Sequence, residues 1–302
     1  MLSRKDIEKE FGKELCFFPL IMENLKENSI NMTISEYAWT QGRATVYWYG
    51  KDKFSVLNEG KNVKATNHFK AGQKAIFTDY HQNKMYLILL PHKTTLVETK
   101  EVIALGNKMG GAVHSKVGIV AQGIGDTGTM LGPGYCGHLM VSLHNITDDV
   151  IALEVGSTFI SLTFDYLNTG VKRTSATVSS HYDRLLEHKC ELSAEDKKYF
   201  NEDWKSDFIS IRNKMVESES YKNYKKSSKN NWRNEVKEYF TKRNFIATLL
   251  VIVLLVGLYF VAVLLDRNSK SPVWVERFWN VGCSGLLGSI LIAIWHFLKD
   301  KK

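Results

Sequence analysis

The chain has 302 residues and a formal net charge of +8, from 40 lysines and arginines against 32 aspartates and glutamates. Its hydrophobic content of 44% and its four prolines exclude a mostly disordered or collagen-like protein. The cysteines form no Cys-x-x-Cys pair, which excludes a zinc ribbon and a dense disulfide framework. The charge alone would fit either a nucleic acid or an anionic membrane as a partner.

The N-terminal part of the chain is predicted to form a β-rich body. It opens with a short charged helix at 4–14, which lacks the apolar stretch of a signal peptide, so a reducing, cytosolic body is expected. Short apolar runs follow, several with the alternation of half-buried strands. The predicted strands are 44–49, 73–78, 84–90, 94–104, 118–122, 137–145, 150–155 and 157–166. Many short strands with few helices favour a jelly roll or a distorted barrel.

Residues 189–243 are predicted to form a basic helical linker. Ser193 and Asp196 have the spacing of an N-cap pair, and apolar residues recur at helical spacing from 199 to 211, as a face that packs on the body would. From 221 to 243, eight basic residues stand against two acidic ones. Beside a membrane span this favours binding to anionic lipid, and the alternative interpretation is binding to RNA or phosphoinositide.

Two uncharged runs, 244–265 and 278–298, are predicted transmembrane helices, because 22 and 21 helical residues cross a hydrocarbon core about 30 Å thick. The second run is less apolar, and its alternative is a re-entrant or interfacial helix. A short polar turn between the runs predicts a hairpin with both termini on one side. Lysines and arginines before the first run and in the tail place both termini in the cytoplasm, and the protein in the inner (cytoplasmic) membrane as a multi-pass protein.

The positive charge is concentrated in the last third of the chain. Residues 1–188 carry a net charge of +1, residues 189–243 carry +4, and residues 244–302 carry +3. A body that binds nucleic acid would be expected to carry a basic face of its own. Nucleic acid is therefore not an expected partner, and the charge indicates contact with a membrane.

Segments in order along residues 1–188 resemble the dCTP deaminase/dUTPase family. LSRKDIEKEFGKELCFFPL resembles the family's opening helix and first strand, and ENSINMTISEYAWT resembles its next strand. HSKVGI stands at the family's Ser-Ser-x-x-Arg-x-Gly-Leu motif, LGPGYCGHLMVSLHN at its Asp-Pro-Gly motif, and VGSTFISLTFDYL at its closing strand. The resemblance implies a mainly β, dUTPase-like distorted jelly roll or barrel. It also implies a homotrimer with nucleotide sites between its subunits.

The same resemblance implies that catalysis is lost. The family's water-orienting Asp falls on Gly132, and its proton-transferring Glu falls on Ser142, and neither residue can serve as a carboxylate base. The family's Arg falls on Lys116, a point charge in place of a two-pronged guanidinium. Asp126 is the nearby acid, and it would activate water only if the motifs align differently.

Nucleotide binding is expected to persist without catalysis. Ser115 and Lys116 are the candidates for phosphate contact, and Gly132, Gly134 and Tyr135 for the turn that receives sugar and base. No catalytic residue and no metal ligand of the protein is predicted, and Mg²⁺ is expected only together with the nucleotide.

These features lead to one interpretation and two alternatives. The chain is interpreted as a membrane-anchored, non-catalytic nucleotide sensor joined to a two-helix membrane effector. Sensor–effector fusions of this plan occur in bacterial anti-phage defence, an analogy of architecture. The alternatives are a membrane-anchored nucleotide hydrolase or deaminase that uses Asp126 or another acid, and a structural trimeric scaffold.

Overall fold

The computed structural model describes residues 1–50, 53–58, 60, 62–126, 128–171, 181–239 and 257. The chain divides into two compact units, Met1–Lys226 and Ser227–Lys302. The first unit holds the described strands and the helices up to α5 (Phe208–Glu217), and it contains the candidate site. Helix α6 (Glu219–Tyr239) begins in the first unit and continues into the second.

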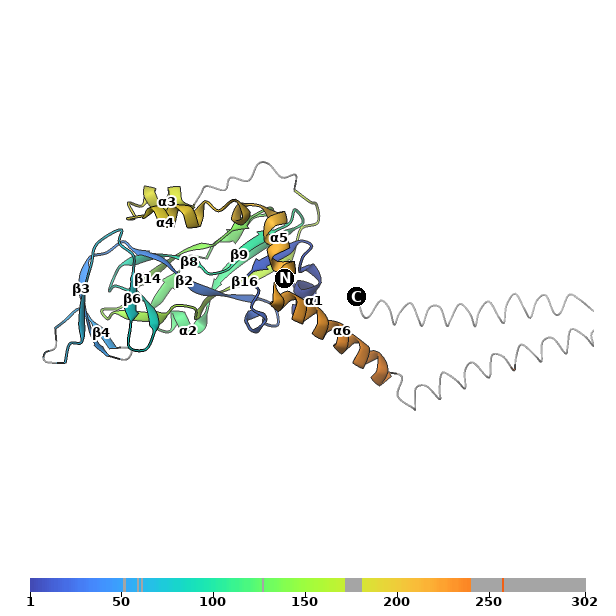
Figure 1. Cartoon of the computed structure of the whole chain (residues 1–302), viewed down its shortest axis with the longest axis horizontal. Helices are drawn as coiled ribbons and strands as arrows, with labels where there is room; N and C mark the ends of the chain where they lie inside the picture. Colours follow the sequence, from blue (N-terminus) through green and yellow to red (C-terminus); the bar gives the residue numbers. More distant parts are fainter. Residues whose placement is uncertain are drawn as a thin grey trace, which may run out of the picture. The chain divides into compact units, whose positions relative to one another are not determined.

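The central sheet of the first unit has seven antiparallel strands (Figure 1). Alternation of inward and outward residues places one face of β14 in the core, where Val141, Leu143 and Asn145 are buried, whereas β8 is buried on both faces. The strand order is β11 (Ile124–Asp126), β14 (Met140–Asn145), β8 (Thr94–Thr99), β2 (Ile30–Thr40), β16 (Thr158–Tyr166), β10 (Met109–Ser115) and β12 (Met130–Leu131).

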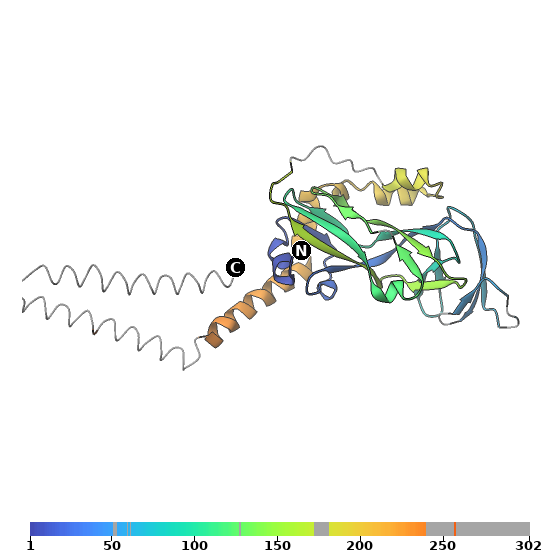
Figure 2. The same cartoon turned by 180° about the vertical axis from the view of Figure 1, so that it is seen from behind.

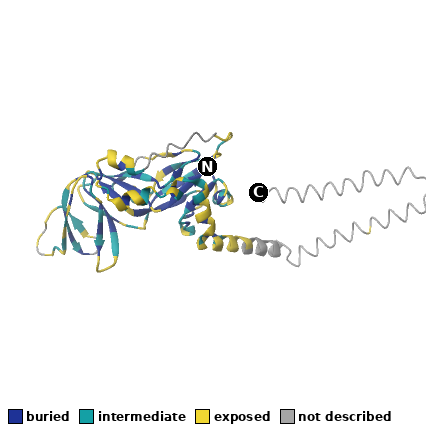
Figure 3. Cartoon of the chain, turned by 45° about the horizontal axis from the view of Figure 1, so that its top comes forward, coloured by how far each residue is buried: buried dark blue, intermediate teal, exposed yellow. Residues whose placement is uncertain are grey.

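Three smaller sheets, each of three antiparallel strands, complete the β structure. The first is β1 (Leu15–Phe18), β9 (Val102–Leu105) and β13 (Cys136–Gly137). The second is β15 (Ile151–Glu154), β7 (Lys84–Leu89) and β6 (Ile76–Asp79). The third is β4 (Lys53–Ser55), β3 (Ala44–Gly50) and β5 (Ala65–Phe69), and it shares an aromatic cluster with β6 and β7 of the second. Figure 3 shows the buried residues concentrated within the sheets.

Helices after the β body pack against it, as the apolar spacing of the linker predicted. In α5, Ile211 and Met215 are fully buried, and the backbone N–H of Phe17 in β1 donates to Met215 Sδ at 3.3 Å. The guanidinium of Arg212 donates to the carbonyl of Gly12 at 2.6 Å. Burial of these side chains supplies the stabilisation that a short, polar helix lacks by itself. The N-cap pair at Ser193 is also confirmed, with a capping box to Asp196.

Helices α3 (His181–Glu187) and α4 (Ala194–Phe200) lie along one side of the sheets, as both Figure 1 and Figure 2 show. Leu185 of α3 is buried with Trp39 and Leu96, and Phe200 of α4 packs on the same cluster. An ion pair also holds α4 on the sheets, since Lys74 Nζ lies 2.7 Å from the carboxylate of Asp196.

The mainly β fold followed by helices is confirmed, with corrections to the predicted elements. The predicted strand 137–145 is two strands, β13 and β14, in different sheets, and the predicted strand 73–78 begins only at Ile76, in β6. Residues 118–122, predicted as a strand, lie largely in a helical turn, α2 (Val117–Val120). The predicted strand 94–104 is two strands, β8 and β9, which belong to different sheets. The opening helix, α1 (Arg4–Glu10), ends four residues before its predicted end.

The predicted transmembrane helices 244–265 and 278–298 lie outside the described residues, except for Gly257. Within the part of the chain that the structure describes, no helix has the length and apolar character needed to cross a bilayer.

Candidate functional site

The two candidates for phosphate contact lie where β10 ends and α2 begins. Ser115 is the last residue of β10 and is exposed. Lys116 is the N-cap of α2, and its ammonium group donates to the hydroxyl of Thr158 at the start of β16. Partial burial, together with the charge of Lys26, lowers the pKa of Lys116. The arrangement presents one hydroxyl and one amine at a strand end, which suits contact with an anionic group.

The candidate turn for sugar and base is a type II β-turn over Gly132–Tyr135. The N–H of Tyr135 donates to the carbonyl of Gly132 at 3.2 Å. Gly134 has a φ of 76° at the third position, where a type II turn needs a positive φ, and Pro133 fits the second position. The turn is anchored to the body, because the N–H of Gly134 donates to the carbonyl of Gly106 at 3.1 Å.

Within one chain, the structure keeps these two groups of residues apart. Leu131 pairs with Gly111 near the beginning of β10, so the turn that starts at Gly132 lies at that end of the strand. Ser115 lies at the opposite end of β10. Four residues of strand from Gly111 to Ser115 correspond to roughly 13 Å. A ligand that touches both groups in one chain would therefore have to span the length of β10.

The positions at which the family's acids were expected carry no acid and have different surroundings. Gly132 is exposed, and a Cβ atom placed on it would meet no atom within 4 Å. Ser142 lies in β14 opposite Leu96 of β8, so the two share a face of the sheet. Leu96 and Met140 of that face pack under α3 and α4. The backbone of Asp126 pairs with Leu143, the residue after Ser142.

An unpredicted cluster of ionisable groups lies on the same sheet face, centred on Glu98. Glu98 in β8 is fully buried, and its Oε2 accepts a hydrogen bond from His181 Nδ1 at 2.9 Å. Burial opposes the charged form of His181, but the attraction and hydrogen bond of Glu98 together outweigh it and raise the pKa of His181. The pair therefore ties α3 to the central sheet by a charged contact with little access to water.

His138, in the short link between β13 and β14, is the second histidine of this cluster. Its Nδ1 donates to the carbonyl of Thr99 at 2.9 Å, which leaves Nε2 of the neutral ring as an acceptor. Burial lowers the pKa of His138 to about 4, so the ring is neutral at pH 7. The ring stacks on Tyr199 with centroids 5.2 Å apart.

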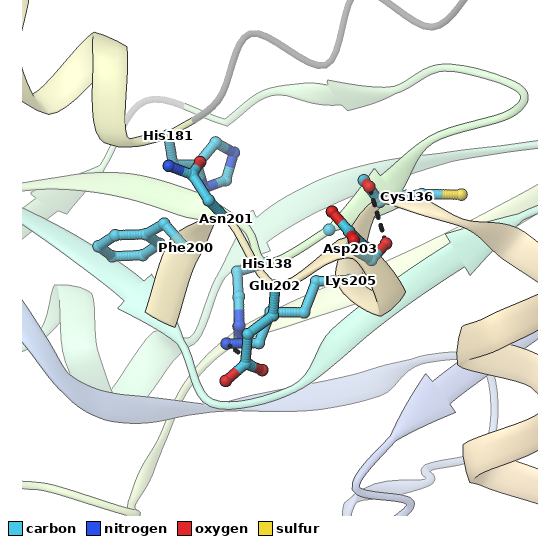
Figure 4. Close-up of a pocket in the computed structure, with 10 residues that line it drawn as sticks. Cys136, His138, His181, Phe200, Asn201, Glu202, Asp203 and Lys205 are labelled. Atoms are coloured by element: carbon cyan, nitrogen blue, oxygen red, sulfur yellow. Dashed lines mark hydrogen bonds and ion pairs between the residues drawn. The ribbon is translucent and has the colours of Figure 1, made fainter. Parts of the chain in front are cut away.

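A cavity of about 320 Å³ opens beside these residues, under the connection from α4 to η2 (Asp203–Ser206) (Figure 4). The buried Lys205 donates to the carbonyl of Tyr199 at 2.5 Å and lies 3.4 Å from the carboxylate of Glu202. The lining consists of Cys136, Gly137, His138, His181, Phe200, Asn201, Glu202, Asp203, Lys205 and Ser206.

Sequence reasoning missed this cluster because its members come from four separate segments. Glu98 and His181 are 83 residues apart, and no motif joins them. The one local signal was Glu98 as the single charged residue in a largely buried strand, β8. Among the described residues, no group of three or more His, Cys, Asp or Glu side chains is arranged to hold a metal ion.

Comparison with protein families gives one match to the body. A family model described as dCTP deaminase-like matches residues 1–167. No curated protein matches the chain significantly.

Several solved structures are similar at low identity. The dCTP deaminase of Agrobacterium tumefaciens is 14% identical with a TM-score of 0.38, over 61% of this chain and 54% of that one. The chain thus spans about half of that enzyme's length. The dUTPase of EIAV is 19% identical with a TM-score of 0.26, over 35% of this chain and 93% of that one. The dUTPase from phage phi11 of S. aureus is 14% identical with a TM-score of 0.25, over 31% of this chain and 79% of that one.

Proposed function

Because the chain belongs to the dCTP deaminase-like family through residues 1–167, we propose that it is a nucleotide-binding sensor that has lost the family's catalysis and acts at a membrane. The observation that carries the proposal is the chemistry of two positions. Gly132 and Ser142 stand where the family's acids are expected, and neither can activate water or move a proton as a carboxylate does. The candidate turn at Gly132–Tyr135 and the lysine at the end of β10 support retained binding.

The packing around Ser142 supports the loss of catalysis. Its neighbours on the sheet face, Leu96 and Met140, are covered by the apolar side chains of α3 and α4. The apolar side chains of this cover supply no carboxylate, and Glu98, the buried carboxylate on the same face, is already paired with His181.

A homotrimer is part of the proposal. In one chain, Ser115 and the turn at Gly132 lie at opposite ends of β10. In a symmetric ring of subunits, one subunit's strand end would meet the next subunit's turn, and one nucleotide would contact both. Mg²⁺ would enter with the phosphates, since it is usually bound through one or two carboxylates and substrate phosphates.

The proposed output of the sensor is at the membrane. Helix α5 is docked on β1 through Met215, and α6 follows it after one residue. The runs 244–265 and 278–298 anchor the chain in the inner membrane, with both termini cytoplasmic and with the basic residues between 221 and 243 on anionic lipid. Nucleotide binding would change helix packing, and the proposed biological setting is anti-phage defence acting on the membrane.

A membrane-anchored hydrolase of the dUTPase or dCTP deaminase type is the second candidate. It would use Asp126, whose backbone in β11 pairs with Leu143 of β14, the residue after Ser142. An acid on that strand would be the source of any remaining water activation.

Incubation with dUTP and dCTP in the presence of Mg²⁺ separates the two candidates. The sensor binds a nucleotide, measured by thermal shift of the full-length chain, and releases neither diphosphate nor ammonia. Turnover that Asp126→Asn abolishes would establish the hydrolase and refute the sensor. The absence of both binding and turnover would leave a structural scaffold.

A further inference from the structure

The three-stranded sheet of β4, β3 and β5 carries a local excess of positive charge. The segment 43–70, which forms this sheet, has six lysines and arginines against two aspartates and glutamates, a net charge of +4. Because residues 1–188 together carry only +1, the rest of that range carries −3. The near-neutral body therefore includes one basic region of the kind that proteins use to bind nucleic acid.

One face of this sheet is packed and the other is open. Val46 and Trp48 of β3 belong to the aromatic cluster that the sheet shares with β6 and β7. Alternation along the strand places Tyr47 on the opposite face, together with its register partners Ser55 in β4 and Thr66 in β5. The sheet lies at the end of the first unit away from α5, as both Figure 1 and Figure 2 show. The residues of this outer face are Thr45, Tyr47, Lys53, Ser55, Thr66 and His68.

The centre of the outer face is an aromatic ring with polar neighbours. Tyr47 is half-buried, and within the described part of the chain its side chain has no ring contact and no hydrogen bond. Beside it, Thr45 Oγ1 and His68 Nδ1 are hydrogen-bonded at 2.9 Å, so these two side chains lie on the same face. An antiparallel sheet with an aromatic ring on its open face is a surface on which single-stranded nucleic acids stack their bases.

Exposed cations stand at both ends of the outer face. Arg43 directly precedes β3, and Lys53 in β4 pairs with Gly50 at the end of β3. The seven residues of strand from Arg43 to Gly50 correspond to roughly 23 Å. Neither cation forms an ion pair with an acid among the described residues. The two positive charges are therefore available to phosphate groups on either side of the central ring.

A hollow of about 490 Å³ lies at the Arg43 end of the outer face. Arg43, Thr45 and His68 contribute to its lining. The other charged side chains of the lining, Lys70 and Glu191, offset each other, so Arg43 supplies its unbalanced charge. A guanidinium group in such a hollow suits a pair of hydrogen bonds to one phosphate.

We propose that the outer face binds single-stranded nucleic acid without reading its sequence. Tyr47 stacks on a base, and Arg43 and Lys53 contact phosphates on either side of it. The charges alone would also suit an anionic membrane, but the aromatic ring between them favours bases over lipid headgroups. The face is separate from the phosphate candidates Ser115 and Lys116, so the inference does not rest on the proposed function.

Binding of a labelled oligothymidylate of about 12 nucleotides tests the stacking contact. Fluorescence anisotropy is measured on the full-length chain in nanodiscs of zwitterionic lipid. Tyr47→Leu should weaken binding about tenfold, because stacking on one base is lost, and Tyr47→Phe should bind normally. Tyr166→Leu, which removes an exposed tyrosine at the end of β16, is the matched control. No saturable binding by the unchanged protein, or equal affinity in Tyr47→Leu, would overturn the proposal.

Salt dependence tests the phosphate contacts. In the double variant Arg43→Met with Lys53→Met, the slope of log affinity against log salt should become less steep by about 1.4, since each phosphate contact contributes about 0.7. Lys226→Met, in the basic helix α6, should leave the slope unchanged. A change of slope in Lys226→Met but not in the double variant would place the oligonucleotide on the linker and overturn the proposal.

Two further comparisons separate the proposal from its rivals. If the double variant lost binding to phosphatidylserine vesicles but kept its oligonucleotide affinity, the outer face would be a lipid contact and the proposal would be wrong. Lys116→Met should leave oligonucleotide binding unchanged. If nucleoside triphosphates fail to bind while the oligonucleotide binds through Tyr47, the proposed function fails and this surface stands.

Discussion

Glu98 Oε2 in the central sheet lies 2.9 Å from Nδ1 of His181 in α3, and this contact links parts of the chain that are 83 residues apart. It is a buried ion pair between the sheet and the segment that covers it. The covering segment also packs on the sheet through the apolar side chains of Leu185 and Phe200. The ion pair therefore adds one charged contact to a surface that is otherwise apolar, and it fixes where the segment lies.

Removal of His181 should destabilise the first unit strongly. His181→Ala leaves the Glu98 carboxylate buried without its partner, and the free energy of unfolding should fall by about 3 kcal/mol, measured by urea denaturation. His92→Ala is the matched control, because the His92–Asp148 pair is exposed and should contribute less than about 1 kcal/mol. If both variants lost the same free energy of unfolding, the buried pair would contribute no more to stability than the exposed pair.

The stability of the protein should depend on pH through His138. Burial lowers the pKa of this ring from 6.5 to about 4, so the folded state disfavours the protonated ring. The stability that this group contributes is complete above pH 6.5 and is lost as the pH falls towards 4, by up to about 3 kcal/mol. His181 acts in the opposite sense, because its pKa is raised.

Comparison with a variant isolates the contribution of His138. In His138→Phe, the fall in unfolding free energy between about pH 7 and about pH 4, measured by denaturant titration at each pH, should be smaller than in the unchanged protein. Identical pH profiles would mean that His138 is protonated as easily when folded as when unfolded.

A methyl group at Gly72 should displace the segment between α3 and α4. A Cβ atom on Gly72 would clash with the backbone carbonyl of Lys189, and its φ of 83° already disfavours other residues. Gly72→Ala should lose about 2 kcal/mol more than Gly60→Ala, which shares a positive φ but meets no atom within 4 Å. Thermal unfolding measures the difference, and limited proteolysis after α3 should accelerate only in Gly72→Ala.

The phosphate contact assigned to Lys116 is tested by removing its charge. Lys116→Met should lower the affinity for a nucleoside triphosphate by about tenfold, because a charge-assisted hydrogen bond to phosphate is lost. Lys70→Met, which changes a lysine in the loop after β5, controls for the general loss of charge. Titration calorimetry at two salt concentrations measures both variants. Unchanged affinity in Lys116→Met would remove this residue from the site.

The predicted membrane anchor is tested by truncation. A chain that ends at Tyr239 lacks both runs, 244–265 and 278–298, and should move from the membrane pellet to the soluble fraction on cell fractionation. The full-length chain should stay in the pellet after carbonate washing. Equal distribution of the two forms would contradict the predicted anchor.

Much of the β body followed from the sequence, because alternation of apolar and polar residues reflects burial of one strand face. Strand β14 is the clearest case, with Val141, Leu143 and Asn145 inward. Residues 118–122 misled because their β-branched members favour a strand by propensity. The N–H groups of Ile119 and Val120 instead bond back to the carbonyl of Lys116, which starts a helical turn.

The buried cluster could not be predicted because tertiary packing alone creates it. In the sequence, Glu98, His138 and Lys205 are separate polar residues with no common motif. They come close together because α4 and η2 lie over β13 and β14. The separation of Ser115 from Gly132 also depends on strand pairing, since their sequence distance does not reveal that β10 lies between them.

One measurement tests the central claim most directly. The full-length chain is titrated with dCTP and with dUTP in the presence of Mg²⁺, and the nucleotide is then recovered and identified by chromatography. A sensor without catalysis binds at least one of them saturably and returns it intact. Recovery of dUTP from bound dCTP, or of a monophosphate from either, would contradict the claim that the substitution of both family acids, at Gly132 and Ser142, has ended the chemistry.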